Sequence, residues 1–365
     1  MGAGTLDGNA IVYCEGVFGT STGKTAHGLV RRTSRYRVIG VIDGRLAGRD
    51  AGEVLDGRRV GIPLQASLGA ALEAARETGT TATHFVVGIA TDGGRLPAAA
   101  RAAVLDAIHA GLNVDSGLHD FLSDDAEIAA AAASRGVKLR DIRKTPARGE
   151  LHGFTGKIGQ VGAFRIAVLG TDAAVGKRTT AWKLVEGLER SGHRAAMVGT
   201  GQTAWLQGVR HGIVLDSLVN DFVAGELEHA VWSCWNDEKP EFIVIEGQGS
   251  LLNPAYPGGL EIVAASRPHA IVLQHAPSRH DYEGFEGYPI HPLPLQRHVL
   301  ELLSGKPVIA ITLNHEGLEP VDVPRACEAI SNELDLPCTD VLLDGPDALV
   351  KAVLASKPTP SGGGR

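Results

Sequence analysis

The stretch FRIAVLGTDAAVGKRTTAWKL, residues 164–184, decides the fold of the second half of this chain. Its first seven residues are mostly apolar, which predicts a strand buried on both faces of a sheet, and residues 180–192 have the period of a helix. Backbone N–H groups at the start of such a helix point into the preceding loop and bind anionic oxygens, while Lys177 adds positive charge. The stretch therefore predicts a P-loop that holds a pyrophosphate.

The predicted cofactor-binding residues all lie in this loop and in the first turn of the helix: Gly170, Thr171, Asp172, Gly176, Lys177, Arg178, Thr179 and Thr180. Compared with the common pattern, the first glycine lies one residue earlier, and Arg178 stands where a hydroxyl group normally binds magnesium. Thr179 or Thr180 can replace that hydroxyl. If neither does, the loop holds a phosphate-bearing cofactor without hydrolysing it.

Composition describes a globular protein without a broad basic surface. The chain has 365 residues, 44% hydrophobic and 21% charged, with a net charge of −7, which disfavours a nucleic-acid partner. Its four cysteines are far apart, and no apolar run reaches the length of about 18 residues that spans a bilayer. We therefore expect a cytoplasmic protein that binds a small molecule but neither nucleic acid nor membrane. The sequence leaves open whether it forms a homo-oligomer.

Strand and helix patterns alternate along the whole chain, which predicts the α/β class with parallel sheets. An N-terminal Rossmann-like parallel-sheet domain is followed by a P-loop NTPase-like doubly wound domain. The predicted strands of the first domain are 10–14, 36–43, 84–90, 113–117 and 137–143. The expected boundaries are 1–146 for the Rossmann-like domain, 147–163 for a linker, 164–355 for the P-loop domain and 356–365 for a disordered tail.

Three side chains of the second domain are candidates for catalysis. Glu246 and His275 each end an apolar strand, at the edge where open α/β sheets bind ligands. A carboxylate or an imidazole there can act as a base. Asp221 follows in LDSLVNDF and can deprotonate an amine or bind magnesium, although capping of a helix explains it slightly better.

The residues predicted to bind the substrate come from both domains. Gln202 and Thr203 follow a strand and offer hydrogen bonds, and Arg279 can bind a carboxylate in a bidentate way. Arg95 and His119 lie in loops that leave the carboxyl ends of strands in the first domain. For each of these residues an ordinary role in a turn or loop is the alternative.

The first domain has a second loop of similar appearance, GVFGTSTGKT at 16–25. It follows a strand and ends in GKT, but Phe18 occupies the position five residues before Gly23 where a P-loop has glycine. The loop also lacks the G-x-G-x-x-G spacing of dinucleotide sites. Asp43, at the end of the next strand, takes the place of a ribose-binding acid, so a weak dinucleotide site and a plain turn both stay open.

The motif GTDxxVGK at 170–177, followed by EGxG at 246–249, resembles dethiobiotin synthetase and its ATP-using relatives. In that family the glutamate of EGxG lies near the metal and the phosphates. The resemblance implies the same place for Glu246.

A resemblance over nearly the full length is to the bacterial D-glutamate N-acetyltransferase family, long catalogued only as a domain of unknown function. The stretches that carry it are GTDAAVGKRTTA (170–181), GTGQTAWLQG (199–208), NDFVAGE (220–226), EGQGS (246–250), GGRLP (93–97) and SGLHDFLSDD (116–125). The resemblance implies acetyl-CoA as acyl donor and an enzyme of amino-acid metabolism.

Three functional hypotheses follow. The first is an N-acetyltransferase that binds acetyl-CoA at the P-loop and acetylates the amino group of a small acidic amino acid. The second is an ATP-dependent kinase or ligase that activates a small carboxylate, with magnesium on Thr179 and Glu246. The third is a nucleotide-binding regulatory module without catalysis.

Overall fold

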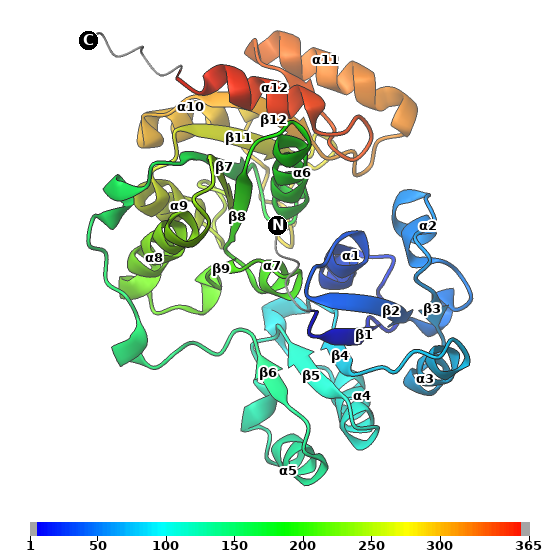
Figure 1. Ribbon diagram of the computed structural model, residues 1–365. Coiled ribbons are helices and arrows are strands. Elements are labelled where there is room, and N and C mark those ends of the chain that lie inside the picture. The colour runs from blue at the N-terminus through cyan, green and yellow to red at the C-terminus, as the bar shows by residue number, and fades with distance from the viewer. Residues whose placement is uncertain (1–5, 359–365) are drawn as a thin grey trace. The chain divides into compact units, whose positions relative to one another are not determined.

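The computed structural model describes residues 6–358, which form two compact units (Figure 1). Unit 1 is Met1–Pro146 together with Gln202–Gly208, and unit 2 is Ala147–Gly201 together with Val209–Arg365. The chain therefore leaves unit 2 after Gly201, adds a short segment to unit 1 and returns at Val209. Of the expected disordered tail, residues 359–365 lie outside the described part of the chain.

Unit 1 is built on a parallel sheet, which within residues 6–358 has six strands in the order β3-β2-β1-β4-β5-β6. This is the Rossmann order, with the reversal of direction between β1 and β4. Its strands are β1 (Gly8–Tyr13), β2 (Tyr36–Ile42), β3 (Leu64–Gln65), β4 (His84–Val87), β5 (Asn113–Ser116) and β6 (Leu139–Asp141). Its helices are α1 (Lys24–Arg31), α2 (Ala51–Asp56), α3 (Leu68–Glu77), α4 (Ala98–His109), α5 (Ala126–Arg135) and α7 (Gln202–Leu206).

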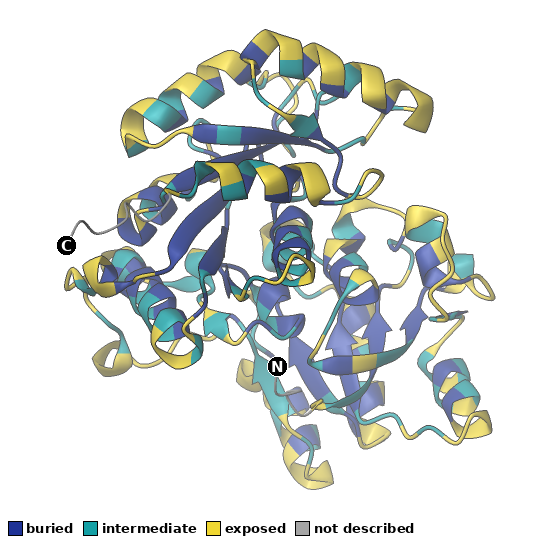
Figure 2. Ribbon diagram, turned by 45° about the horizontal axis from the view of Figure 1, so that its top comes forward, coloured by how far each residue is buried: buried dark blue, intermediate teal, exposed yellow. Residues whose placement is uncertain are grey.

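Local sequence explains where the helices of unit 1 begin and end. The carboxylates of Asp50 and Asp125 accept hydrogen bonds from the first N–H groups of α2 and α5. Gly57 and Gly136 end the same helices in the left-handed conformation. Helix α7 contacts α1, whereas α3 and α5 both contact α4. These helices cover the buried strands, which are dark blue in Figure 2.

Unit 2 has seven parallel strands among the described residues, in the order β13-β12-β11-β7-β10-β8-β9. They are β7 (Phe164–Gly170), β8 (Ala195–Gly199), β9 (His211–Gly212), β10 (Phe242–Glu246), β11 (Ala270–His275), β12 (Val308–Leu313) and β13 (Cys338–Thr339). The helices are α6 (Lys177–Arg190), α8 (Asn220–Glu238), α9 (Gly259–Ser266), α10 (Leu293–Ser304), α11 (Val323–Leu334) and α12 (Asp347–Ser356). The predicted α/β class with a Rossmann-like and a P-loop domain is confirmed.

Strand β7 positions the site because it lies between β10 and β11 and is buried along its whole length. Gln274 of β11 pairs with Gly170, and Glu246 of β10 pairs with Val168. The ends of three parallel strands therefore bring the loop after Gly170, Glu246 and His275 to the same edge of the sheet.

Residues 147–163, expected as a linker, belong to unit 2 and pack against α8. The buried carboxylate of Glu228 accepts hydrogen bonds from the backbone N–H groups of Thr155 and Ile158. One charged side chain thus fixes this segment, because a buried carboxylate must be satisfied by several donors.

Candidate functional site

The loop between β7 and α6 has the backbone of an anion-binding loop. Ala174 and Gly176 both have positive φ, +55° and +105°, which turns consecutive N–H groups toward one side of the loop. Gly176 precedes the first residue of α6, and no side chain caps the helix there. The uncapped N-terminus of a fourteen-residue helix favours negative charge at this point.

The backbone N–H groups of three consecutive loop residues have no acceptor among the described residues: Ala174, Val175 and Gly176. Beside them lies Lys177, which is only 7% exposed and whose Nζ donates to the carbonyl oxygens of Asp172 (2.5 Å) and Gly249 (2.9 Å). Unused amide donors next to a lysine fit the oxygens of a pyrophosphate.

Asp172 is fully buried and connects the loop to two other segments. Its Oδ1 accepts from the Nδ2 of Asn253 (2.8 Å), after β10. Its Oδ2 accepts from Arg279 (2.9 Å) and from the N–H group of Glu283 (2.8 Å), after β11. Arg279 also donates to Ala173 O and to Glu316. Two residues predicted to hold ligands, Asp172 and Arg279, therefore form an internal ion pair.

Two further loop residues contact side chains of β11. The hydroxyl of Thr180 donates to the Oε1 of Gln274, and the hydroxyl of Thr171 lies 3.0 Å from the Nδ1 of His275. Burial lowers the pKa of His275 to about 4, so its imidazole is neutral at neutral pH. Thr179 is half-buried in the first turn of α6.

Glu246 is 3% exposed at the end of β10. Its Oε2 accepts from the N–H group of Thr200 (2.9 Å), and Gly201 N–H also donates to this carboxylate. Burial raises the pKa of Glu246, although the charges of Arg178 and Lys177 and the two amides oppose the shift. A carboxylate with a raised pKa is a stronger base than one with the ordinary pKa.

The other predicted residues lie apart from this group. Asp221 is exposed near the start of α8. Gln202 and Thr203 belong to unit 1, where Thr203 contacts Thr25 at 3.0 Å between hydroxyl oxygens. Gln202 packs so closely on Gly117 that a Cβ on that glycine would come within 2.6 Å of its side chain.

The last two residues predicted to bind the substrate, Arg95 and His119, lie in loops at the carboxyl ends of β4 and β5. Arg95 forms an ion pair with Asp120 at 3.2 Å. His119 lies against Gly94, which has a positive φ of +62°, and its N–H group donates to the Gly94 carbonyl. Unit 1 therefore gathers Arg95, His119 and Gln202 around loops after adjacent strands.

Sequence reasoning missed residues that complete the site. Gln274 accepts from Thr180 and Thr312 inside the sheet, and Asn253 supports Asp172. A glutamine within the otherwise apolar run AIVLQH was the signal for the first of them.

Residues 16–24 of unit 1, whose sequence resembles the P-loop, make different hydrogen bonds within the loop. Phe18 is fully buried, and its N–H group donates to the carboxylate of Asp43 (2.9 Å). Its carbonyl oxygen lies 2.6 Å from the Nε2 of His27. The N–H groups of Thr20 and Gly23 donate to carbonyls within the loop. Protein groups therefore accept from part of the backbone of this loop, and Asp43 binds the N–H group of Phe18.

Within residues 6–358, no three or more His, Cys, Asp and Glu side chains form a group that could hold a metal ion. In the same part of the chain, no helix combines the length and apolar character needed to cross a bilayer.

Comparisons with known proteins agree with this architecture. Two relatives are named D-glutamate N-acetyltransferase. The one from Tritonibacter scottomollicae is 29% identical over 78% of this chain and 84% of its own length. The one from a Pseudoalteromonas species is 30% identical over 74% of this chain and 80% of its own length. These names support a transferase.

A solved structure is similar over nearly the whole chain. The crystal structure of a DUF1611 family protein from Anabaena variabilis has a TM-score of 0.86 and 30% identity, and the match covers 95% of this chain and 99% of that one. Residues 152–350 match the P-loop domain of DUF1611, described as a domain of unknown function, and residues 44–145 match its Rossmann-like N-terminal domain. Because both domains match in this order, the chain belongs to the DUF1611 family.

Proposed function

We propose that this protein is an N-acetyltransferase that transfers the acetyl group of acetyl-CoA to the amino group of a small acidic amino acid, with D-glutamate as the first substrate to test. The observation that carries the proposal is the row of unused N–H groups at Ala174, Val175 and Gly176 beside Lys177. The names of the two relatives supply the choice of reaction.

The loop fits the pyrophosphate of coenzyme A. Its N–H groups would bind the phosphate oxygens, and Lys177 would exchange its two carbonyl acceptors for a charged one, which makes a stronger hydrogen bond. Arg178, next in sequence, adds a guanidinium that suits phosphate. Acetyl-CoA supplies the acetyl group as a thioester.

The chain must then remove a proton from the substrate, because the amino group of an amino acid is protonated at neutral pH and an ammonium cannot attack a thioester. Glu246 is the base we assign, since burial raises its pKa. The amine nitrogen forms the new amide bond, the carbon–sulfur bond breaks, and the coenzyme leaves as a thiol after proton transfer.

The alternative bases are less suited to this step. The pKa of His275 is about 4, and its Nδ1 contacts Thr171. Asp221 is exposed, so solvent competes for its carboxylate. We do not assign Arg279 or Thr203 to the substrate, because Arg279 already binds Asp172 and Thr203 contacts Thr25. We place the reaction in the cytoplasm.

The test is release of the coenzyme A thiol from acetyl-CoA with D-glutamate, compared with L-glutamate and D-aspartate. Glu246→Gln should lower kcat by roughly a hundredfold or more and change KM much less. Asp221→Asn serves as the matched control and should stay near wild type. Magnesium-dependent release of ADP from ATP with no thiol release would refute the acetyl-transfer proposal and support the kinase or ligase alternative.

A further inference from the structure

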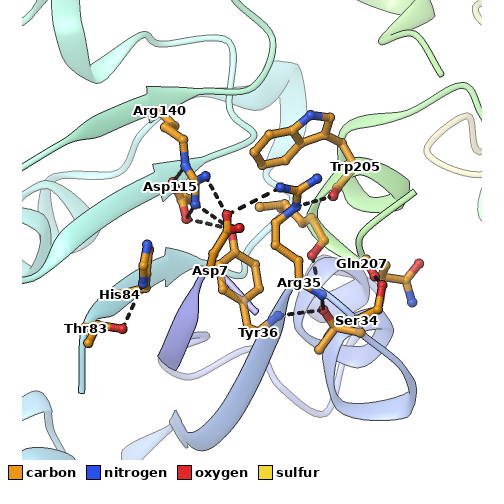
Figure 3. Close-up of polar contacts among 12 residues, drawn as sticks. Asp7, Ser34, Arg35, Tyr36, Thr83, His84, Asp115, Arg140, Trp205 and Gln207 are labelled. Carbon is orange, nitrogen blue, oxygen red and sulfur yellow. Dashed lines mark hydrogen bonds and ion pairs between the residues drawn. The ribbon is translucent and has the colours of Figure 1, made fainter. Parts of the chain in front are cut away.

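The polar cluster of unit 1 shows how buried polar groups are normally paired. The fully buried carboxylate of Asp115 accepts from Arg140 at 2.5 and 2.7 Å and from the hydroxyl of Tyr36 at 2.6 Å (Figure 3). The guanidinium groups of Arg35 and Arg140 lie over the indole ring of Trp205, at 3.7 and 5.2 Å from its centroid. Such pairing is expected, because a buried polar group without a partner destabilises the fold.

The hydroxyl group of Ser250, in the segment after β10 of unit 2, is an exception. Ser250 is 2% exposed, and its Oγ is buried without a hydrogen-bond partner among the described residues. Its backbone is fully used, since its N–H group donates to the carbonyl oxygen of Tyr256 (3.1 Å) and its carbonyl oxygen accepts from the N–H group of Asn253 (3.2 Å). The side chain alone therefore calls for a partner from outside the chain.

Two hydrogen bonds attach the segment that carries Ser250 to the phosphate loop of the same unit. The Nζ of Lys177 donates to the carbonyl oxygen of Gly249, the residue before Ser250 (2.9 Å). The Nδ2 of Asn253, three residues later, donates to the Oδ1 of Asp172 (2.8 Å). Ser250 thus lies between two points of attachment to the loop, and its unsatisfied hydroxyl is one residue away from the carbonyl group that Lys177 binds.

The groups around this carbonyl favour an anion as the missing partner. The ammonium group of Lys177, which is only 7% exposed, and the unused N–H groups of residues 174–176 are all donors. A hydroxyl can also donate, so an anionic oxygen bound by these groups suits Ser250 as an acceptor. When Lys177 turns from Gly249 to a phosphate, that peptide group loses its contact with the lysine, and glycine has no Cβ to hinder its rotation.

We propose that Ser250 is a further binding residue for the pyrophosphate of coenzyme A: its hydroxyl donates to a phosphate oxygen once Lys177 has left the Gly249 carbonyl. The assignment rests on the proposed function, because it uses the same coenzyme site. It adds to the phosphate loop a donor from the segment after β10, and it makes Lys177 the residue that releases this donor. The hydroxyl destabilises the free protein while it is unsatisfied, and it strengthens the complex when the phosphate accepts from it.

The experiment compares Ser250→Ala with wild type in two measurements. Without ligand, Ser250→Ala should raise the melting temperature by about 2–4 °C, because the unsatisfied hydroxyl is gone. Isothermal titration should show acetyl-CoA binding weakened by about tenfold or more, the effect of losing a hydrogen bond to a charged group. A residue that only supports the loop would lower both quantities when it is replaced, so a fall in both would overturn the proposal.

Ser217 provides a matched control within unit 2. Its Oγ is also buried and has no partner in the described part of the chain. Ser217 follows β9, however, which β10 and β8 separate from β7 in the sheet. Ser217→Ala should therefore also raise the melting temperature, but it should change acetyl-CoA affinity by less than about twofold. An equal loss of affinity in the two variants would mean that removal of any buried hydroxyl acts indirectly, and the proposal would be wrong.

Two further titrations identify the bound group and separate two kinds of failure. Ser250→Ala should weaken the binding of inorganic pyrophosphate by the same factor as that of acetyl-CoA, and unchanged pyrophosphate affinity would contradict the assignment. If Lys177→Met keeps full acetyl-CoA affinity, the coenzyme site and this inference fail together. If Lys177→Met loses affinity but Ser250→Ala does not, the coenzyme site stands and only the role of Ser250 is wrong.

Discussion

The loops at 16–24 and 170–177 both follow a buried strand, and both lead into a helix that begins at a lysine, Lys24 in α1 and Lys177 in α6. They differ in what fills them. In unit 1 the ring of Phe18 and the carboxylate of Asp43 occupy the turn. In unit 2 the backbone curves through positive φ at Ala174 and Gly176, and the N–H groups of residues 174–176 are unused.

The difference teaches that a glycine and a lysine before a helix are not sufficient for an anion site. An amide donor is available only if neither a side chain nor a carbonyl of the protein already accepts from it. The residues between the glycines determine whether the loop can bind an anion. Phe18 reaches the core, whereas the alanines of the second loop have no side chain that can return to cap the helix.

We expect the largest effect from a substitution that distorts the backbone of the second loop. Gly176→Val places a β-branched side chain at a φ of +105°, which costs about 1–3 kcal/mol of strain or forces the loop to change shape. Acetyl-CoA affinity should fall roughly a hundredfold or more because the amides lose their common direction. Isothermal titration measures it.

The matched change in the first loop is Gly23→Ala. A Cβ there would lie 2.8 Å from both the Val17 carbonyl and the Nε2 of His27, so the melting temperature should fall. Acetyl-CoA affinity should stay as in wild type. A loss of affinity here would mean that the first loop also binds the coenzyme.

The next largest effect on acetyl-CoA affinity is expected for Lys177, with Lys24 as the matched position in the first loop. Lys177→Met should weaken acetyl-CoA binding by about ten- to a hundredfold, the worth of a charge-assisted hydrogen bond. Lys24→Met should change the affinity by less than about twofold, since Phe18 and Asp43 occupy the turn before it. Equal effects of both substitutions in a titration with acetyl-CoA would abolish the distinction between the loops.

A substitution of Arg178 distinguishes acetyl-CoA from ATP with magnesium as the phosphate ligand of the second loop. In an acetyltransferase Arg178→Thr removes a phosphate-binding cation, so acetyl-CoA affinity should fall by about tenfold, and EDTA should have no effect on turnover. In an ATP-using enzyme the new hydroxyl would preserve or raise magnesium-dependent ADP release. Parallel assays with and without EDTA decide between the two outcomes.

The last prediction is an effect on stability, not on affinity, and concerns His275 behind the second loop. Because burial lowers the pKa of His275 from 6.5 to about 4, the unfolded chain binds a proton that the folded one resists between these values. The free energy of unfolding should therefore fall as pH drops from about 6.5 to about 4, by on the order of 3 kcal/mol for this group.

His275→Gln should remove this slope while it keeps a hydrogen-bonding partner for Thr171. His269, whose pKa burial also lowers to about 4, is present in both proteins, so only the difference between their urea-unfolding curves is attributed to His275. Identical pH dependence of the two proteins would contradict the assignment.

Much of unit 2 could be predicted from the sequence because its signals are local. The apolar run of β7, the glycines and Lys177 are neighbours in the chain, and the carboxylate of Glu246 directly follows an apolar strand. Periodicity and turn chemistry suffice for such features. In unit 1 the two-residue strand β3 was missed, because a short edge strand carries almost no pattern.

Contacts between distant residues could not be predicted. Arg279 appeared to be a free loop arginine, whereas it pairs with Asp172, 107 positions earlier. Trp205 appeared to lie in a glycine-rich turn of the second domain, whereas it packs on Arg35, 170 positions earlier. Such pairs depend on how distant parts of the chain pack together, and a short stretch of sequence carries no signal for this.

The insertion of α7 into unit 1 also constrains how the protein can be made. When a ribosome has released residues 1–146, unit 1 still lacks Leu206, and roughly sixty more residues must be synthesised, at about 5–20 residues per second, before α7 exists. For those seconds the nascent Rossmann-like unit exposes the apolar surface that Leu206 will cover and the cations that Trp205 will meet. A fragment cut at Pro146 would keep that surface permanently exposed, so the boundary that looks natural in the sequence is a poor place to divide the protein.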